Sequence, residues 1–318
     1  MASSQMAAAD RRQGKWSTIG WQGISLQVPE DWFPAALGTE RGAGYLRVQC
    51  PDGPSVEVKW ASPKGSVDVE REVAKYRRTL ERAARKRRQA VEWQEKPKVP
   101  VRVARADKNR RFFGWKGDSQ ALGVVWYCRG CGRVIIAQAT FPASQDAELA
   151  STILSSIEDH GEDGRELWSL YGLGVRIPVG WALDKHQLMA GYTMLQFRRG
   201  DRVLRAERWA LANVAMKNAT LPEFLRGRSR KFWKDFRLAD TGAEWRGHAG
   251  AAFSGPTRKV WLRAVALVRL LLRRPAAETM SVRAWHCDAE NKIFAIHAVH
   301  PRGDTAELER ALESLVCH

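Results

Sequence analysis

The sequence predicts an α+β protein made of two tandem copies of one antiparallel β-sheet domain with helices packed on the sheet. A repeated segment, a constant spacing of matched residues, and strand patterns that alternate with helix patterns all indicate this. Gly23–Trp32 reads GISLQVPEDW and returns as GLGVRIPVGW at Gly172–Trp181. The glycine, proline and tryptophan hold the same places in both copies. We therefore expect the second half to repeat the fold of the first.

The spacing between matched residues defines the domains. It is 149 residues up to the pair Trp60 and Trp209, and 159 residues from Trp126 and Trp285 onward, so the second copy holds an insertion. A chain of 318 residues also exceeds the size at which single cores usually stop growing. The predicted parts are a disordered leader at 1–15, a first copy at 16–159, a linker at 160–165 and a second copy at 166–318, with its insertion near 258–279.

The first half of each copy predicts strands followed by a helix. Residues 24–28, 45–49 and 55–60 alternate apolar and polar side chains, which indicates three strands, and we expect them to form an antiparallel meander. Ser66 is the predicted N-cap of the helix that follows. Its core face, at spacings of three and four, consists of Val69, Val73, Tyr76, Leu80 and Ala83.

The second half of each copy predicts more strands and a final helix. In the first copy we expect strands within 99–104, 112–115, 123–128 and 133–141, the last two forming a hairpin. A helix then begins at Ser144, with Leu149, Ile153 and Ile157 facing inward. In the second copy, Thr220-Leu-Pro-Glu223 is typical of a capping box at the start of a helix.

Both copies place basic side chains on the outer face of the helix that follows the first strands. A charge run on a helix is usually its solvated face, but the net charge of +17 and the isoelectric point near 10.1 favour attraction to polyanions. The predicted polyanion-binding residues are Arg77, Arg78, Arg82, Arg85, Lys86, Arg87 and Arg88 in the first copy, and Arg226, Arg228, Arg230, Lys231 and Lys234 in the second.

The insertion contains a basic amphipathic segment at 258–275. Such a segment lies on an anionic membrane, docks into a partner, or covers its own domain. Whether it is a helix or a lengthened strand stays open. The residues predicted to contact a partner or a membrane are Trp261, Val265, Val268, Leu271, Leu272, Arg263, Arg269 and Arg273.

The most specific short motif is Cys128-Arg-Gly-Cys131. It suits half of a zinc site, a disulfide across a hairpin, or two free thiols. A structural zinc site needs four ligands, and the first copy adds only Cys50 and, in the linker, His160. We therefore expect no metal, with Cys128 and Cys131 as weak candidates.

Three histidines in the last hairpin do not form a ligand set under the register that we expect. With a turn at 288–291, His286 should lie opposite Phe294, His297 on the other face of the sheet, and His300 on the face opposite to that of His297. We interpret them as exposed or core-edge residues.

No motif for a reaction is present. The sequence lacks a P-loop, a dinucleotide-binding fingerprint, the zinc-protease HExxH motif and a nucleophile elbow. We expect no enzymatic activity and no cofactor. The first residues lack the apolar core of a secretory signal, and five cysteines are too few for a disulfide scaffold, so we expect a soluble cytoplasmic protein.

The opening pattern of each copy, Gly-apolar-x-apolar-x-apolar-Pro-x-x-Trp, resembles the PsbP-like superfamily, which includes the Ran nucleotide-release factor. Gly23–Trp32 and Gly172–Trp181 carry most of the match, and the order of elements as far as Ile157 and Val316 carries the rest. The resemblance implies an α/β/α sandwich that serves as a binding or assembly module without catalytic groups. The tandem arrangement, the basicity and the insertion depart from its small single-domain members.

Two functions follow as hypotheses. The first is a non-enzymatic binding protein that engages a polyanion, most plausibly RNA or a ribonucleoprotein, through the basic helix faces. The alternative is an assembly or adaptor protein that uses the 258–275 segment to join a protein partner, to form a homo-oligomer or, less plausibly, to contact an anionic membrane surface.

Overall fold

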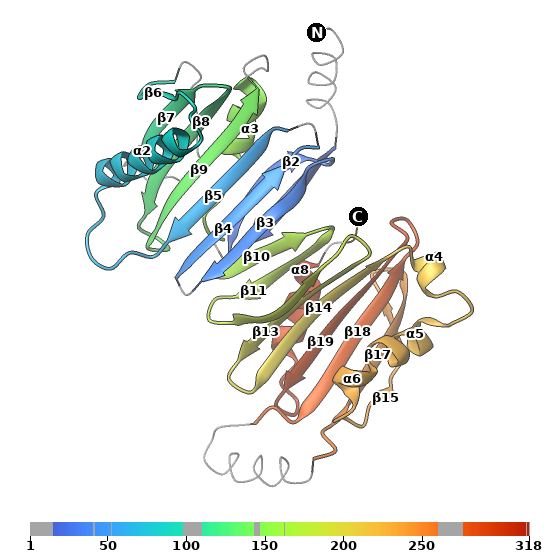
Figure 1. Ribbon diagram of the computed structural model, residues 1–318. Coiled ribbons are helices and arrows are strands. Elements are labelled where there is room, and N and C mark those ends of the chain that lie inside the picture. The colour runs from blue at the N-terminus through green and yellow to red at the C-terminus, as the bar shows by residue number, and fades with distance from the viewer. Residues whose placement is uncertain are drawn as a thin grey trace. The chain divides into compact units, whose positions relative to one another are not determined.

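A computed structural model describes residues 15–40, 42–51, 53–97, 110–142, 147–161, 163–259, 276–315 and 317 (Figure 1). The chain divides into two compact units, Met1–Leu167 and Trp168–His318. Each contains a large antiparallel sheet accompanied by helices, so the protein belongs broadly to the α+β class. None of the helices in the described ranges has the length and apolar character needed to cross a membrane.

The first unit is built on a sheet with the strand order β3-β4-β5-β9-β8-β7-β6. A separate hairpin, β1–β2, precedes it. The strands are β1 (Trp16–Trp21), β2 (Ile24–Pro29), β3 (Phe33–Glu40), β4 (Ala43–Gln49), β5 (Ser55–Ala61), β6 (Glu92–Gln94), β7 (Arg110–Lys116), β8 (Ser119–Cys128) and β9 (Arg133–Pro142).

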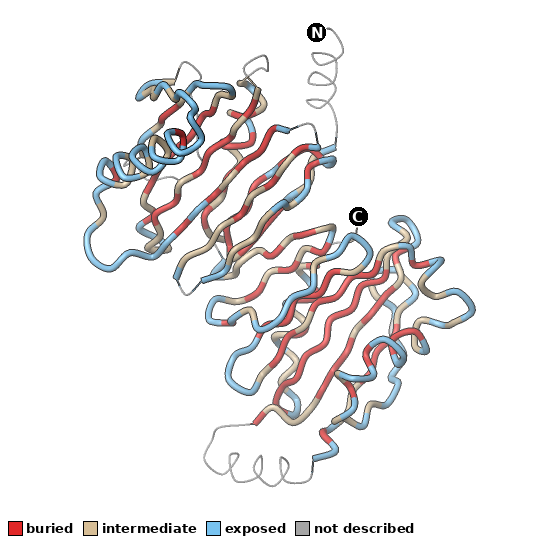
Figure 2. Tube along the Cα trace, in the orientation of Figure 1, coloured by how far each residue is buried: buried red, intermediate tan, exposed pale blue. Residues whose placement is uncertain are grey.

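The helices of the first unit lie on opposite faces of this sheet (Figure 1). Helix α2 (Val69–Lys86) buries Val69 against Val125 of β8 and Val134 of β9. Helix α3 (Ala147–Ser155) packs on the other face, which alternation along β9 assigns to Ala139 and Phe141. Burial is greatest along the central strands (Figure 2).

The second unit has the matching strand order β12-β13-β14-β19-β18-β17-β15, with β16 paired to β17. Strands β10 and β11 are hydrogen-bonded neighbours. The strands are β10 (Arg165–Leu170), β11 (Leu173–Pro178), β12 (Ala182–Leu188), β13 (Tyr192–Arg199), β14 (Arg202–Ala210), β15 (Ala239–Asp240), β16 (Ala243–Trp245), β17 (His248–Pro256), β18 (Thr279–Cys287) and β19 (Lys292–His300).

The helices of the second unit cover its sheet as well. Phe224 and Leu225 of α5 and Trp233 of α6 join a core cluster with Trp209, Phe253 and other residues of the central strands. Helix α8 packs against β11 and β19. The helices are α4 (Ala212–Ala215), α5 (Leu221–Arg228), α6 (Arg230–Trp233) and α8 (Ala306–Ser314).

The meander prediction is wrong for its first strand. Residues 24–28 lie in β2, which pairs with β1 and not with β4. The cause is the tight turn at Gln22 and Gly23, whose φ angles of 55° and 80° are those of a two-residue hairpin turn. The meander consists instead of β3, β4 and β5.

The predicted start of α2 is also wrong. The N-cap is Asp68, whose Oδ1 accepts a hydrogen bond from the backbone N–H of Arg71 at 3.3 Å, and Ser66 lies before the helix. Ala84 is buried and Ala83 is exposed, so the last core position of the helix lies one residue later than predicted. The aspartate is the better cap here because its charge also favours the positive helix N-terminus.

Other predicted elements are confirmed. Residues 112–115, 123–128 and 133–141 lie in β7, β8 and β9, and β8 and β9 form the expected hairpin. The capping box of Thr220 and Glu223 is present at the start of α5. That helix ends at Ser229, however, and α6 begins after it, so the second copy has two short helices where the first has one long helix. The strand predicted at 99–104 and the helix start at Ser144 lie outside the described residues.

Candidate polyanion-binding surfaces

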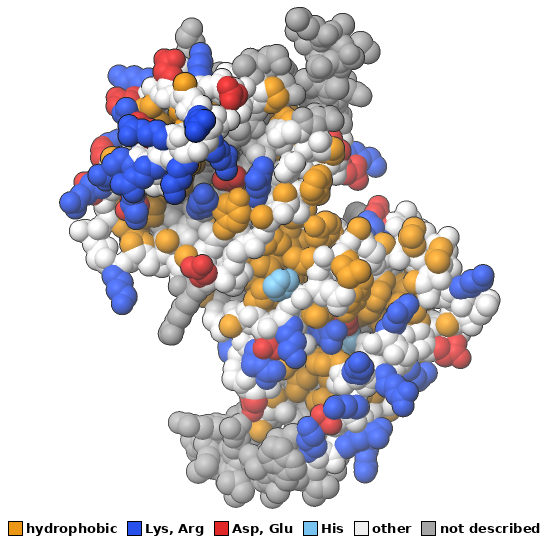
Figure 3. Space-filling view, viewed as in Figure 1, with side chains coloured by type: hydrophobic (Ala, Val, Ile, Leu, Met, Phe, Trp, Pro, Cys, Tyr) orange, Lys and Arg blue, Asp and Glu red, His pale blue; other side chains and the backbone are white. Residues whose placement is uncertain are grey.

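The end of α2 carries a dense group of cations, which we call the α2 basic surface. Lys and Arg side chains gather over this helix (Figure 3). All of its members are exposed. They are the predicted residues Arg77, Arg78, Arg82, Arg85, Lys86, Arg87 and Arg88.

Most of these charges have no ionic partner in the part of the chain that the structure describes. Within the described part of the chain, only Arg77 of the α2 basic surface forms an ion pair, with Glu81 at 2.8 Å. Nearer the start of the helix, Lys75 pairs with Glu72, and Arg111 of β7 pairs with Glu70. Positive charge therefore remains uncompensated at one end of α2. Part of that arrangement stabilises the helix itself, since cations suit a helix C-terminus.

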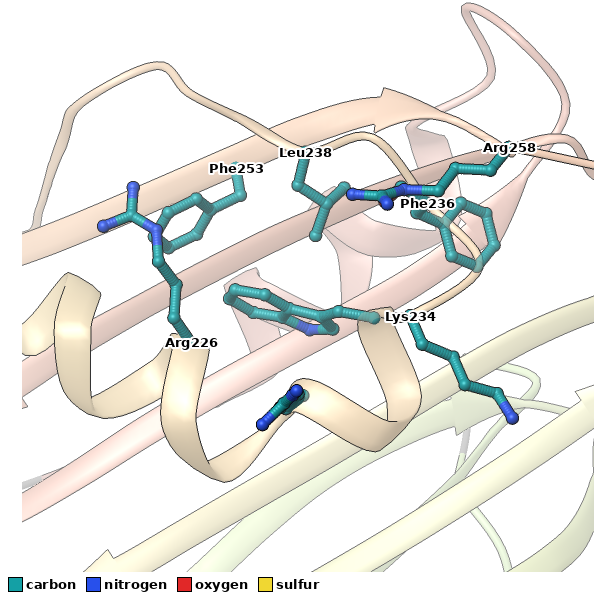
Figure 4. Close-up of a pocket in the computed structure, with 8 residues that line it drawn as sticks. Arg226, Lys234, Phe236, Leu238, Phe253 and Arg258 are labelled. Carbon is teal, nitrogen blue, oxygen red and sulfur yellow. The ribbon is translucent and has the colours of Figure 1, made fainter.

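The second copy forms a pocket beside its basic helices. The pocket has a volume of about 360 Å³ and lies between α5, α6 and β17 (Figure 4). Of the predicted residues, Arg226, Arg230 and Lys234 line it, while Arg228 and Lys231 do not. We call it the α5–α6 basic pocket. Its full lining is Arg226, Arg230, Trp233, Lys234, Phe236, Leu238, Phe253 and Arg258.

Guanidinium groups meet apolar side chains in this pocket. Arg226 lies over the ring of Phe253, 5.1 Å from its centroid, and pairs with Asp240 at 3.3 Å. Arg258 donates a hydrogen bond from Nε to the carbonyl oxygen of Phe236 at 2.8 Å. In Figure 4, Arg226 lies beside Phe253, and the guanidinium group of Arg258 lies beside Leu238. The pocket thus offers fixed cations beside an apolar floor.

A buried charged network lies behind that floor. The indole of Trp233 donates to Nδ1 of His297 at 3.1 Å, and Nε2 of His297 lies 2.7 Å from Oε2 of Glu207. Arg205 approaches the other carboxylate oxygen at 2.9 Å, and the hydroxyl of Tyr192 donates to it. Glu207 is 2% exposed and His297 is 0% exposed, so a molecule in the pocket cannot contact either side chain directly.

The network keeps Glu207 ionised. Burial by itself would raise the pKa of this carboxyl group, but the interactions with His297 and Arg205 outweigh burial and lower the pKa. The network was not predicted. A glutamate inside the apolar strand pattern of β14 was its one signal in the sequence, and that signal does not identify a partner.

The predicted register of the last hairpin is wrong by one residue. His286 lies opposite Ile293, and Trp285 lies opposite Phe294. His286 and His297 consequently share a face of the sheet, whereas His300 lies on the other. The reason is that the turn holds the four residues 288–291, so Cys287 pairs with Lys292, and Asn291 has a φ of 49°. In the described ranges, none of the three histidines belongs to a group of metal-ligating residues.

Cys128 and Cys131 flank the turn between β8 and β9, and both are free thiols. Burial, with smaller contributions from Cys128 and Asp159, raises the pKa of Cys131 to about 12. A thiol with such a pKa is protonated at neutral pH and is a poor nucleophile. Asp159 and His160 lie beside the two cysteines, and Cys50 does not belong to this group.

The predicted partner segment is outside the described residues. This applies to Trp261, Val265, Val268, Leu271, Leu272, Arg263, Arg269 and Arg273. Only the first two residues of the 258–275 segment are described, and one of them, Arg258, lines the α5–α6 basic pocket.

No protein-family model matches this sequence, and no curated protein matches it. Among solved structures, the chain is similar to the T6SS immunity protein TplEi from Pseudomonas aeruginosa, in a structure complexed with "L" peptide. The two share 9% sequence identity over 94% of this chain and 97% of that chain, with a TM-score of 0.32. A likeness this weak carries no argument about activity.

Proposed function

We propose that this protein is a non-enzymatic cytoplasmic binding protein for a polyanion, and that the polyanion is RNA or a ribonucleoprotein. The observation that carries the proposal is the group of exposed cations at the end of α2, most of which have no ionic partner among the described residues. Such cations bind phosphates with release of condensed counterions, which supplies favourable free energy at low and moderate salt.

The α5–α6 basic pocket favours single-stranded RNA over other polyanions. Unpaired bases stack on apolar and aromatic side chains while cations contact the phosphates. Trp233, Phe236 and Leu238 provide the apolar part, and Arg230 and Lys234 provide exposed cations at the rim. Heparin-like polymers lack bases and would use the cations alone.

We also propose that each unit is a PsbP-like α/β/α sandwich. The support is the packing of α2 and α3 on opposite faces of the first sheet, together with the matching strand order of the second sheet. Members of that family mostly serve as binding or assembly modules, which agrees with a function that needs no catalytic group.

The test measures RNA affinity as a function of salt. Fluorescence anisotropy with a labelled single-stranded RNA compares the full chain with a variant that carries Arg85→Glu, Lys86→Glu, Arg87→Glu and Arg88→Glu. We expect the affinity of the unchanged protein to fall steeply with salt. The variant should bind RNA of any sequence more weakly, and the slope of log affinity against log salt should decrease by up to about 3, at about 0.7 for each phosphate that is no longer neutralised.

A matched control separates the surface from the net charge. Lys185→Glu, Lys217→Glu, Arg302→Glu and Arg310→Glu change the same number of exposed cations at positions outside both basic surfaces. This control should keep most of the affinity and nearly the full salt slope. Equal losses in the two variants, or binding that salt does not weaken, would reject the α2 basic surface as an RNA site. Thermal unfolding of each variant checks that it is folded.

A further inference from the structure

Four side chains with metal-binding atoms converge beside the β8–β9 turn. They are Cys128 at the end of β8, Cys131 in the turn, and Asp159 and His160 in the segment that follows α3. One ligand atom from each lies within 4.8 Å of all the others. Residues more than two dozen positions apart in the chain therefore meet in a single cluster.

Hydrogen bonds outside the cluster orient two of these ligands. The indole of Trp126 donates to Oδ2 of Asp159 at 2.9 Å, which turns Oδ1 toward the cluster. Nδ1 of His160 lies 3.2 Å from the carbonyl oxygen of Gly161, so a proton on Nδ1 is held there and Nε2 presents its lone pair. Metal-binding histidines and carboxylates in proteins are held in the same way by their outer hydrogen bonds.

Oδ1 of Asp159 and Nε2 of His160 face each other without a hydrogen bond between them. Asp159 is 2% exposed, and its buried Oδ1 accepts no hydrogen bond from any described residue. Oδ1 lies 3.5 Å from Nε2 of His160, too far for a hydrogen bond. In a tetrahedral site with metal–ligand distances of 2.0–2.1 Å, two ligand atoms are about 3.4 Å apart. The observed separation therefore matches the edge of such a site.

Gly130 leaves room for the cluster. A Cβ atom added at this position would lie 3.0 Å from Nε2 of His160 and 3.6 Å from Sγ of Cys128. Any larger residue would press on two of the four side chains. The turn thus brings the histidine and the cysteines together because Gly130 has no side chain.

We propose that Cys128, Cys131, Asp159 and His160 form a structural zinc site. Two thiolates and one imidazole suit Zn²⁺, which prefers four ligands in a tetrahedron, and a carboxylate is an accepted fourth ligand. Mg²⁺ and Ca²⁺ prefer oxygen ligands and are disfavoured by the two sulfur atoms. Four protein ligands leave no open position, so the site stabilises the fold and does not perform a reaction.

The second unit carries a related but smaller cluster. Cys287, which aligns with Cys128, lies near Cys317 and His248. Glu290 stands where the first copy has Cys131, and the indole nitrogen of Trp285, which aligns with Trp126, has no hydrogen-bond partner among the described residues. The second cluster therefore lacks both the cysteine pair across the turn and the indole–carboxylate bond. An experiment on the first site must keep this second cluster from contributing.

The test uses cobalt as a probe for zinc in the full chain with Cys317→Ser, which disables the second cluster. Titration of this reduced protein with Co²⁺ should saturate at about one ion per chain and give the strong visible bands of tetrahedral cobalt with a thiolate charge-transfer band. One equivalent of Zn²⁺ should abolish these bands, because zinc replaces cobalt at the site.

Ligand variants and matched controls are made in the same background. Cys131→Ser and His160→Gln should each weaken Co²⁺ binding by more than about 100-fold, and Trp126→Phe by about 10- to 100-fold, the effect of losing an outer hydrogen bond. Cys50→Ser and His186→Gln remove a thiol and an imidazole outside the cluster, and they should leave Co²⁺ affinity unchanged.

Three results would overturn the proposal. The first is cobalt binding without a thiolate band, and the second is equal cobalt binding in Cys131→Ser and Cys50→Ser. The third is a disulfide between Cys128 and Cys131 in protein alkylated directly in the cell lysate. Circular dichroism checks the fold of each variant. If a variant is unfolded, the test uses the protein in which all four ligands are unchanged. Its melting temperature should rise when Zn²⁺ is added, because a structural site binds the metal only in the folded state.

Discussion

Glu207 illustrates how single residues support the second unit. Its carboxylate lies in the core, and His297, Arg205 and Tyr192 all contact it. Removing one partner of a buried charge is far more destabilising than replacing the whole group by apolar residues, because the remaining charge is left without compensation. The same network contacts the floor of the α5–α6 basic pocket through Trp233. The network therefore supports the position of Trp233 in the pocket floor.

His297→Phe should lower the free energy of unfolding by about 3–5 kcal/mol, since the buried charge of Glu207 would lose its contact with the imidazole. The double variant His297→Phe with Glu207→Gln should recover part of this loss, because it removes the charge. Urea denaturation measures both. The prediction fails if the double variant is destabilised by the sum of the two single effects.

The lowered pKa of Glu207 also predicts a dependence of stability on pH. A carboxyl group whose pKa is lowered by folding contributes stability above its unfolded pKa of about 4.3. That contribution is lost as the pH falls through the folded pKa. The unchanged protein should therefore lose stability below about pH 4.5 more steeply than Glu207→Gln does. Parallel curves of unfolding free energy against pH would show that this group does not contribute.

At the scale of elements, α2 combines two tasks. Its apolar side, with Val69 buried and Val73 and Tyr76 half-buried, packs on the sheet, and its outer side carries the α2 basic surface. Asp68 fixes where the helix begins, and the spacing of its apolar residues sets which side faces outward.

Asp68→Ala should lower the free energy of unfolding by about 1 kcal/mol, the usual effect of losing an N-cap. Ser66→Ala is the matched control, because Ser66 is exposed and precedes the helix. It should change the stability by less than about 0.5 kcal/mol. Chemical denaturation compares the two. Equal effects would mean that the side chain of Asp68 does not cap α2.

At the scale of the whole molecule, the two units share one strand order and each carries a basic surface. Substitutions at distant sites without shared partners usually have additive effects. The α2 basic surface and the α5–α6 basic pocket belong to different compact units.

A pocket variant that combines Arg226→Glu, Arg230→Glu and Lys234→Glu should bind RNA more weakly. Its loss in log affinity should add to the loss caused by the four α2 substitutions. Additivity follows because the two sets belong to different compact units, each with its own core. Anisotropy titrations of the two variants and of their combination measure it. A pocket variant with unchanged affinity would restrict the RNA site to α2.

Local patterns predicted much of the architecture. The alternation in 112–115, 123–128 and 133–141 is a property of neighbouring residues, and so is the capping box of Thr220 and Glu223. The cations of α2 were likewise predicted, because helical periodicity alone separates them from the buried face. The two copies of Gly-x5-Pro-x2-Trp were visible without any structure.

Other features depend on contacts between residues far apart in the chain. Only the folded chain places Asp159 and His160 beside Cys128 and Cys131, Arg258 beside Trp233, and His297 against Glu207. The amino-acid sequence alone determined the repeated plan, the strands with clear alternation and the positive charge, because these follow from spacing and composition. The tertiary structure decided the pairing of β2, the register of the last hairpin and the meeting of the four metal-binding side chains. Local sequence patterns are compatible with several such pairings, and turn geometry and side-chain packing select one of them.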